Sequence, residues 1–193
     1  VHPGESVSSF ACEGLMRELL SESPLARKLR AKYVFKIVPM LNPDGVVLGN
    51  YRTNLSGRDL NRVWNQPCKF LHPTIYFAKR ALMSRCAPLG VFADLHGHSR
   101  KLNWFIYGCL PPRKPRKRSN IPPFVLPPPD MRTRDAVLLP LLLSRISQTF
   151  SIKDCYFHMR PQKESTARIT IYKELALPRC VTVEISFCGS SER

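Results

Sequence analysis

The sequence opens with Val1-His2-Pro3-Gly4-Glu5, in which a histidine and a glutamate stand three residues apart on a predicted tight turn. That spacing directs both side chains toward one spot, where an imidazole nitrogen and a carboxylate oxygen are suitable ligands for a tetrahedral zinc ion. A catalytic zinc also needs a third protein ligand and an open fourth position. A His-x-x-Glu pair often occurs by chance, so the rest of the chain must support the hypothesis.

The best third ligand is His96, within Asp94-Leu95-His96-Gly97-His98-Ser99. It follows the short apolar run Val91-Phe92-Ala93, and residues 90–96 therefore predict a short strand that delivers the histidine. The residues predict one metal centre, made by His2, Glu5 and His96.

Length and composition indicate one domain. The chain has 193 residues and 44% hydrophobic content, which is enough for a hydrophobic core. It contains no run of about 18 apolar residues, so we expect no membrane-spanning segment. It begins without Met and without the basic-then-apolar pattern of a signal peptide, and we expect a fragment of a longer chain.

The formal net charge of +16 predicts an acidic partner: nucleic acid, a membrane surface or an acidic polypeptide. One run, Arg113-Lys114-Pro115-Arg116-Lys117-Arg118, is either a solvated loop or a site for nuclear import or nucleic-acid contact. The seven cysteines are odd in number and form no Cys-x-x-Cys motif. They indicate reduced thiols in a cytosolic protein, and most are expected to act as small buried hydrophobes.

Hydrophobic periodicity predicts alternating helices and strands, which is typical of an α/β layer architecture. The predicted helices span residues 10–20, 25–30, 72–85 and 137–150. The predicted strands span residues 33–40, 90–96, 103–108, 155–159 and 181–187, with a short extended piece at 169–172. A turn is predicted at 42–45, a polar loop at 163–168, and an insertion rich in proline and basic residues at about 110–135.

Glu184 lies within a strand of period-two alternation. A carboxylate among apolar residues costs desolvation energy unless it has a partner or a function. It is either a glutamate that faces water at the strand end or a general base that moves a proton from water to a leaving amine.

Arg52, Asn61 and Arg62 form a second group, on polar loops. The planar guanidinium of arginine suits a carboxylate, so these residues fit a substrate that ends in a free carboxylate. The alternative is that they are ordinary surface residues of a basic protein.

Several motifs share one order along the chain, and together they are specific. They are His2-Pro3-Gly4-Glu5-Ser6, Asn42-Pro43-Asp44-Gly45, Gly49-Asn50-Tyr51-Arg52, Asp59-Leu60-Asn61-Arg62, Asp94-Leu95-His96-Gly97-His98-Ser99, Tyr107-Gly108-Cys109, Lys163-Glu164-Ser165-Thr166-Ala167-Arg168 and Glu184-Ile185-Ser186-Phe187-Cys188-Gly189. In these motifs the chain resembles the zinc metallocarboxypeptidases, and among them the cytosolic carboxypeptidases that remove glutamates from tubulin.

The resemblance implies a role for each candidate residue. The implied roles are zinc ligands at His2, Glu5 and His96, a general base at Glu184, an oxyanion-stabilising group at Arg52, a clamp for the terminal carboxylate at Asn61 and Arg62, and a receptor for an acidic side chain at Arg168. Asp94 and His98 flank the third ligand and are either groups that orient it or ordinary polar residues of a strand end.

The resemblance also implies the fold: a three-layer α/β/α architecture with a mixed central sheet, truncated at both ends. Residues 1–193 are then a partial catalytic domain with the insertion at about 110–135, lacking a strand before His2 and a helix after Gly189.

The function implied is zinc-dependent hydrolysis of C-terminal or side-chain glutamates from acidic tails such as tubulin's. The expected partners are those tails or microtubules, with one zinc ion as cofactor, in the cytoplasm, with the cytoskeleton or nucleus as further locations. The alternatives are an aspartoacylase-like zinc amidohydrolase and a non-catalytic basic scaffold or nucleic-acid binder. The chain lacks a Gly-x-x-x-x-Gly-Lys-Ser/Thr loop, so nucleotide binding is not among the properties carried over from the resemblance.

Overall fold

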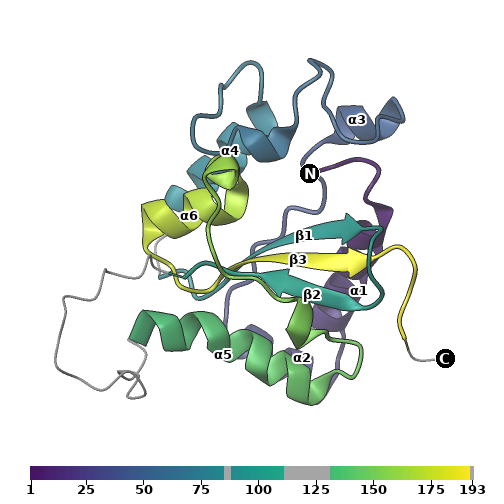
Figure 1. Cartoon of the computed structure of the whole chain (residues 1–193), viewed down its shortest axis with the longest axis vertical. Coiled ribbons are helices and arrows are strands. Elements are labelled where there is room, and N and C mark those ends of the chain that lie inside the picture. Colours follow the sequence, from purple (N-terminus) through teal and green to yellow (C-terminus); the bar gives the residue numbers. More distant parts are fainter. Residues whose placement is uncertain (85–87, 111–130, 192–193) are drawn as a thin grey trace, which may run out of the picture.

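A computed structural model describes residues 1–84, 88–110 and 131–191 of the chain (Figure 1). Within these residues the strands form one sheet in the order β1-β3-β2. The strands are β1 (Phe92–His98), β2 (Trp104–Tyr107) and β3 (Cys180–Ser186). The central strand β3 is parallel to β1 and antiparallel to β2, so the predicted mixed sheet is confirmed.

The longer helices lie close to their predicted positions. The α-helices are α1 (Ser6–Leu20), α2 (Pro24–Lys32), α3 (Pro43–Val47), α4 (Pro73–Met83), α5 (Met131–Ile146) and α6 (Ala167–Leu175). Short 3-10 turns occur at η1 (Leu60–Arg62), η2 (Ile152–Asp154) and η3 (Pro161–Lys163). Helix α2 begins as its sequence predicts, because Pro24 starts it and the Ser23 hydroxyl accepts the Ala26 N–H at 3.0 Å.

Helices pack on both faces of the sheet, as two separate hydrophobic cores show. In the view of Figure 1, α4 and α6 appear above the strands and α5 below them. On one face, Phe92 and Cys180 pack into a core with residues from η1, α4 and α6, among them Leu60, Ile75 and Ile171. On the other face, a second core joins β2 and β3 to α5; its members are Ile106, Phe150, Val181, Val183, Leu139 and Leu143. The chain thus has the layered α/β arrangement that the sequence predicts.

Strand register sets the position of the polar residues. His96 pairs with Glu184 between the parallel strands β1 and β3, and Asp94 pairs with Thr182. Directly paired residues point to the same face of a sheet, so these side chains share one face near the carboxyl ends of both strands. Ligand sites in open α/β sheets form at this edge.

The strand predicted over residues 33–40 is wrong. This segment has no regular secondary structure and pairs with no strand in the described part of the chain. Its side chains are largely exposed, with Val34 at 89%. β-Branched and aromatic residues favour a strand, but a strand needs a neighbour that accepts its backbone hydrogen bonds and packs on its face.

The extended piece predicted at 169–172 is also wrong, because these residues lie within helix α6. Ile169 and Ile171 are completely buried there, and the Thr170 N–H donates to the Thr166 carbonyl at 3.0 Å. The β-branched side chains favour a strand on intrinsic grounds, but their burial against the core decides the conformation.

Three further predictions need adjustment. The strand at 155–159 is reduced to one isolated bridge between Tyr107 and Tyr156. The turn at 42–45 is instead the start of α3, where Asn42 Oδ1 accepts the Gly45 N–H at 3.1 Å. Helix α5 already begins at Met131, inside the predicted insertion, while residues 111–130 of that insertion lie outside the described residues.

Among the described residues, no helix combines the length and the apolar character required to cross a membrane.

Candidate metal centre

The first two predicted ligands lie on a turn that leads directly into α1. The Glu5 N–H donates to the His2 carbonyl at 3.2 Å, and Glu5 is the residue that precedes the helix. The Ser8 hydroxyl donates to the Glu5 carbonyl at 2.6 Å and fixes the first helical turn. The third ligand, His96, stands on β1. A helix start and a strand end therefore bring the three side chains to one point.

The structure brings His2, Glu5 and His96 together. One ligand atom from each lies within 4.8 Å of the others, and all three residues are buried. Each histidine turns its Nδ1 toward a different oxygen of the Glu5 carboxylate, at 2.6 Å from His2 and 2.8 Å from His96. The Gly97 N–H also donates to Glu5, at 3.0 Å, and holds the carboxylate in place.

The Nε2 atom of each histidine lies within hydrogen-bond distance of an aspartate carboxylate. His2 Nε2 lies 3.0 Å from Asp59 Oδ1, and His96 Nε2 lies 2.8 Å from Asp94 Oδ2. A neutral imidazole carries one N–H, so a histidine that donates through Nε2 presents a lone pair at Nδ1. Carboxylates placed behind histidines in this way orient zinc ligands and raise their basicity.

The electrostatics favour a cation between these groups. Although burial alone raises the pKa of Glu5, its hydrogen bonds to His2 and His96 hold that pKa well below its ordinary value. Burial alone lowers the pKa of His96, but the Asp94 and Glu5 carboxylates raise it to about 10. Two imidazole nitrogens and one carboxylate fit a zinc ion, whose charge can replace that of the imidazolium protons.

Glu184 stands beside the ligand cluster, on the strand next to His96. It is partly buried, and burial is the main cause that raises the pKa of its carboxyl group. The Glu5 and Asp94 carboxylates raise this pKa further, against the opposing charge of His96. A carboxylate with a raised pKa is suited to accept and return a proton near neutral pH.

Arg52 joins the cluster through Asp59. Its Nε and Nη2 atoms lie 2.9 and 2.8 Å from Asp59 Oδ2, while its Nη1 atom lies 3.9 Å from Glu5 Oε1. The side chain is 41% exposed. The guanidinium is therefore fixed on one side by Asp59 and faces the predicted ligands and solvent on the other.

Asn61 and Arg62 lie in η1, directly after Asp59. Asn61 is buried: its Oδ1 accepts the Ala167 N–H at 2.9 Å, and its Nδ2 lies 3.1 Å from His96 Nε2. Arg62 Nη1 donates to the Asn61 carbonyl at 2.8 Å and lies 3.8 Å from Asp59 Oδ2. Both predicted carboxylate-binding residues are thus adjacent to the metal cluster, and Arg62 is the more exposed.

Arg168, at the start of α6, is 7% exposed. Its Nη1 donates to the Gly108 carbonyl and to Cys109 Sγ, and its Nε has no partner in the described part of the chain. Burial and the charge of Glu184 raise the pKa of Tyr107, while the charges of Lys101, Arg160 and Arg168 lower it.

Asp59 is not among the predicted site residues, but it contacts both a predicted ligand, His2, and Arg52. The signal was present, because Asp59 begins the motif Asp59-Leu60-Asn61-Arg62 and zinc-binding histidines commonly have a carboxylate partner. Of the two residues that flank His96, Asp94 contacts it and His98 does not join the cluster. The His98 ring packs against Phe105 at 4.8 Å between ring centroids.

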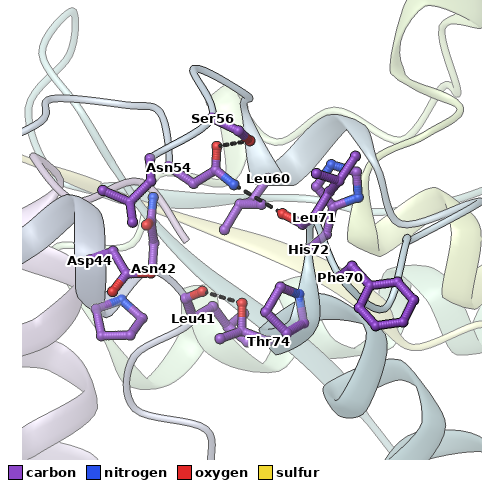
Figure 2. A pocket seen from close by; sticks show the side chains of 13 residues that line it. Leu41, Asn42, Asp44, Asn54, Ser56, Leu60, Phe70, Leu71, His72 and Thr74 are labelled. Atoms are coloured by element: carbon purple, nitrogen blue, oxygen red, sulfur yellow. Dashed lines mark hydrogen bonds between the residues drawn. The ribbon is translucent and has the colours of Figure 1, made fainter.

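A separate hollow of about 200 Å³ lies between α3, α4 and the loop that joins them (Figure 2). Hydrogen bonds cross-link its walls, from Asn54 Nδ2 to the Leu71 carbonyl at 3.3 Å and from Thr74 Oγ1 to the Leu41 carbonyl at 2.6 Å. None of the predicted site residues lines it. The predicted site residues therefore lie at the sheet edge and not in this hollow.

Comparison with known proteins agrees with this geometry. A model described as zinc carboxypeptidase (Peptidase_M14) matches residues 1–137. Cytosolic carboxypeptidase 1 of Homo sapiens is 43% identical over 203 residues, which cover 100% of this chain and 16% of that protein. Cytosolic carboxypeptidase 4 of Homo sapiens is 40% identical over 198 residues, covering 100% of this chain and 17% of that protein.

Solved structures share the fold. A metallo-carboxypeptidase from Burkholderia cenocepacia superimposes with a TM-score of 0.76 at 26% identity, covering 96% of this chain and 46% of that one. A putative carboxypeptidase A from Shewanella denitrificans gives a TM-score of 0.77 at 27% identity, with the same coverage of 96% and 46%. The chain thus spans less than half of these structures and about a sixth of the curated relatives' length.

Proposed function

Because the chain belongs to the zinc carboxypeptidase family, we propose that the protein carrying it is a zinc-dependent metallocarboxypeptidase. Its proposed substrates are the C-terminal or side-chain glutamates of acidic protein tails such as those of tubulin. One observation carries the proposal: His2, Glu5 and His96 converge within 4.8 Å, with Glu184 on the neighbouring strand.

His2, Glu5 and His96 hold the metal in this proposal, and Asp59 and Asp94 orient the two histidines. When bound there, zinc supplies the Lewis acidity that activates water and polarises a carbonyl group. Glu184 takes a proton from the attacking water and passes it to the nitrogen of the leaving amine. Its partly buried position beside His96 and its raised pKa support this role.

Arg52 stabilises the negative charge that develops on the scissile carbonyl oxygen. Its Nη1 edge supports this role, because it faces the ligand cluster while Asp59 holds the rest of the guanidinium. Arg62 binds the terminal carboxylate of the substrate, and Asn61 supports the same end of the site from its buried position beside His96.

The preference for glutamate rests on Arg168. Its guanidinium is buried, and its Nε has no hydrogen-bond partner among the residues that the structure describes. Such a group can bind an acidic side chain strongly, because charge-assisted hydrogen bonds gain strength away from water. The net charge of +16 adds a weaker, long-range attraction for an acidic tail.

The relatives reported above are named carboxypeptidases, so they favour peptide hydrolysis over the aspartoacylase-like and scaffold alternatives. The word cytosolic in the curated names supports a cytoplasmic location for this protein as part of the proposal. The proposal includes two further locations, the cytoskeleton and the nucleus.

Metal analysis of the intact protein tests the proposal. We expect one zinc ion per catalytic domain in the wild type and an empty site in His2→Ala and His96→Ala, measured by elemental analysis after gel filtration. His158→Ala is a matched control, because this histidine lies outside the ligand cluster. Stoichiometric zinc in the double variant of His2 and His96 would refute the ligand assignment.

A further inference from the structure

The turn that carries His2 and Glu5 is enclosed by a second segment, which begins at α3. Pro3, in the turn, packs against Gly45 of that helix. Gly4 packs against the ring of Tyr51, and the Gly4 N–H donates to the Tyr51 carbonyl at 2.8 Å. Pro3 and Gly4, the two residues between the predicted ligands, are therefore each held by a contact with this segment.

Neither Gly4 nor Gly45 has room for a side chain at these contacts. A methyl group on Gly45 would lie 2.5 Å from Pro3 Cγ, and one on Gly4 would lie 2.4 Å from Tyr51 Cδ2. Neither glycine has a positive φ, so the backbone at both positions suits any residue. Glycine is required here by close approach, to Tyr51 at Gly4 and to both Pro3 and the Asn42 side chain at Gly45, and not by local backbone conformation.

The same segment also contacts the His2 ring on the side away from Glu5. Tyr51 is followed by Arg52, whose guanidinium contacts Asp59, and Asp59 contacts Nε2 of His2. The Asn50 N–H donates to the Gly45 carbonyl at 2.8 Å and links Gly45 to the residue before Tyr51. Residues 42–59 thus hold the metal centre at two places: Gly45 and Tyr51 contact the turn that carries the ligands, and Asp59 contacts Nε2 of His2.

We propose that Gly45 and Tyr51 are positioning residues for the metal centre, which fix the turn so that the His2 imidazole and the Glu5 carboxylate meet His96. This inference rests on the proposed zinc site. It predicts that zinc affinity depends on two residues that contact neither the metal nor the substrate.

Gly45 gives one test of this inference. A methyl group there would crowd Pro3 Cγ and also, at 2.8 Å, the side chain of Asn42 that caps α3, so the helix content of Gly45→Ala is measured together with its zinc affinity. A positioning role predicts a weaker metal site. Gly14→Ala is the matched control, because Gly14 lies in α1 and a methyl group there meets nothing within 4 Å.

The experiment uses the intact protein and Zn²⁺ alone, with zinc affinity measured by competition against a chromophoric chelator. We expect Gly45→Ala and Tyr51→Ala to weaken zinc binding about 10- to 100-fold, as changes to groups that orient ligands commonly do. Gly14→Ala and Tyr51→Phe should bind like the wild type. The absorption bands of the Co²⁺-substituted protein should shift in the first pair of variants and not in the second.

Wild-type affinity and an unchanged Co²⁺ spectrum in Gly45→Ala and Tyr51→Ala would overturn the inference and leave the zinc site intact. A wild-type protein that binds no zinc would instead overturn the proposed function. If Gly45→Ala does not fold, the comparison of Tyr51→Ala with Tyr51→Phe decides, because the phenylalanine ring keeps the contact with Gly4.

Discussion

Glu184 is the residue whose surroundings most clearly suit proton transfer, since it is partly buried and that burial, together with the Glu5 and Asp94 carboxylates, raises its pKa. Glu184→Gln keeps the size of the side chain and removes its basicity. We expect this variant to retain zinc and to lose about 10²- to 10⁴-fold in kcat, the usual contribution of a general acid–base group. Zinc content and turnover are measured on the same preparation.

Glu13→Gln makes the same chemical change on the exposed surface of α1 and should leave kcat unchanged. Unchanged turnover in Glu184→Gln would exclude Glu184 as the base. Zinc loss in that variant would place Glu184 among the ligands.

Arg168 is the residue on which substrate choice depends in this account. A charge-assisted hydrogen bond to a buried carboxylate contributes about 1.5–3 kcal/mol, or roughly ten- to hundredfold in selectivity. Arg168→Ala should therefore reduce glutamate release by that factor, while removal of a neutral C-terminal residue falls little. The kcat/KM values for two peptides that differ only in their last residue measure the effect.

Arg168→Lys is the conservative control, since it keeps the charge but not the planar guanidinium. Equal losses on acidic and neutral C-termini in Arg168→Ala would make Arg168 a structural or carboxylate-binding residue.

At the residue scale, the ligand cluster could be predicted because His2 and Glu5 are neighbours in sequence and His96 follows an apolar run. The structure brings these three together. For Asp59 the motif that it begins was a signal, but not for which histidine it contacts. The contact of Tyr51 with Gly4 could not be predicted, because it depends on how the segment that contains α3 folds back on the ligand turn.

Helix α6 is the element in which local preference and tertiary packing disagree. Ile171 is completely buried in the core shared by α4, α6 and the sheet. Ile171→Ala should lower the free energy of unfolding by about 2–5 kcal/mol, because a cavity forms where the side chain was. Urea denaturation of the intact protein, followed by circular dichroism, measures this change.

Ile146→Ala is the matched control, since Ile146 is 79% exposed at the end of α5 and its truncation should change stability by less than about 0.5 kcal/mol. Equal destabilisation by both substitutions would contradict the assignment of α6 to the core.

At the element scale, amphipathic helices and the strand that carries Glu184 were predictable because their periodicity is set by burial. Residues 33–40 and 169–172 were not, since both are rich in β-branched or aromatic residues. The first segment finds no strand partner among the described residues, and the second is buried as a helix. Propensity alone does not decide such cases.

For the whole molecule, the order of helices and strands predicted an α/β architecture, and the mixed sheet with helices on both faces agrees. Sequence alone did not give the strand order β1-β3-β2, because pairing between strands that are distant in sequence is set by tertiary packing. That order places Glu184 of the central strand beside His96 of its parallel neighbour. The candidate site therefore depends on strand order, which brings Glu184 to His96, as well as on the short motif that contains His2 and Glu5.

The most direct measurement is the release of free glutamate from a synthetic peptide with a polyglutamate tail, by the intact protein with and without zinc. We predict release by the zinc-loaded protein, loss of release after chelation, and recovery when Zn²⁺ is added back. A peptide that ends in alanine should be a much poorer substrate. A zinc-loaded protein that releases no amino acid from either peptide would contradict the account.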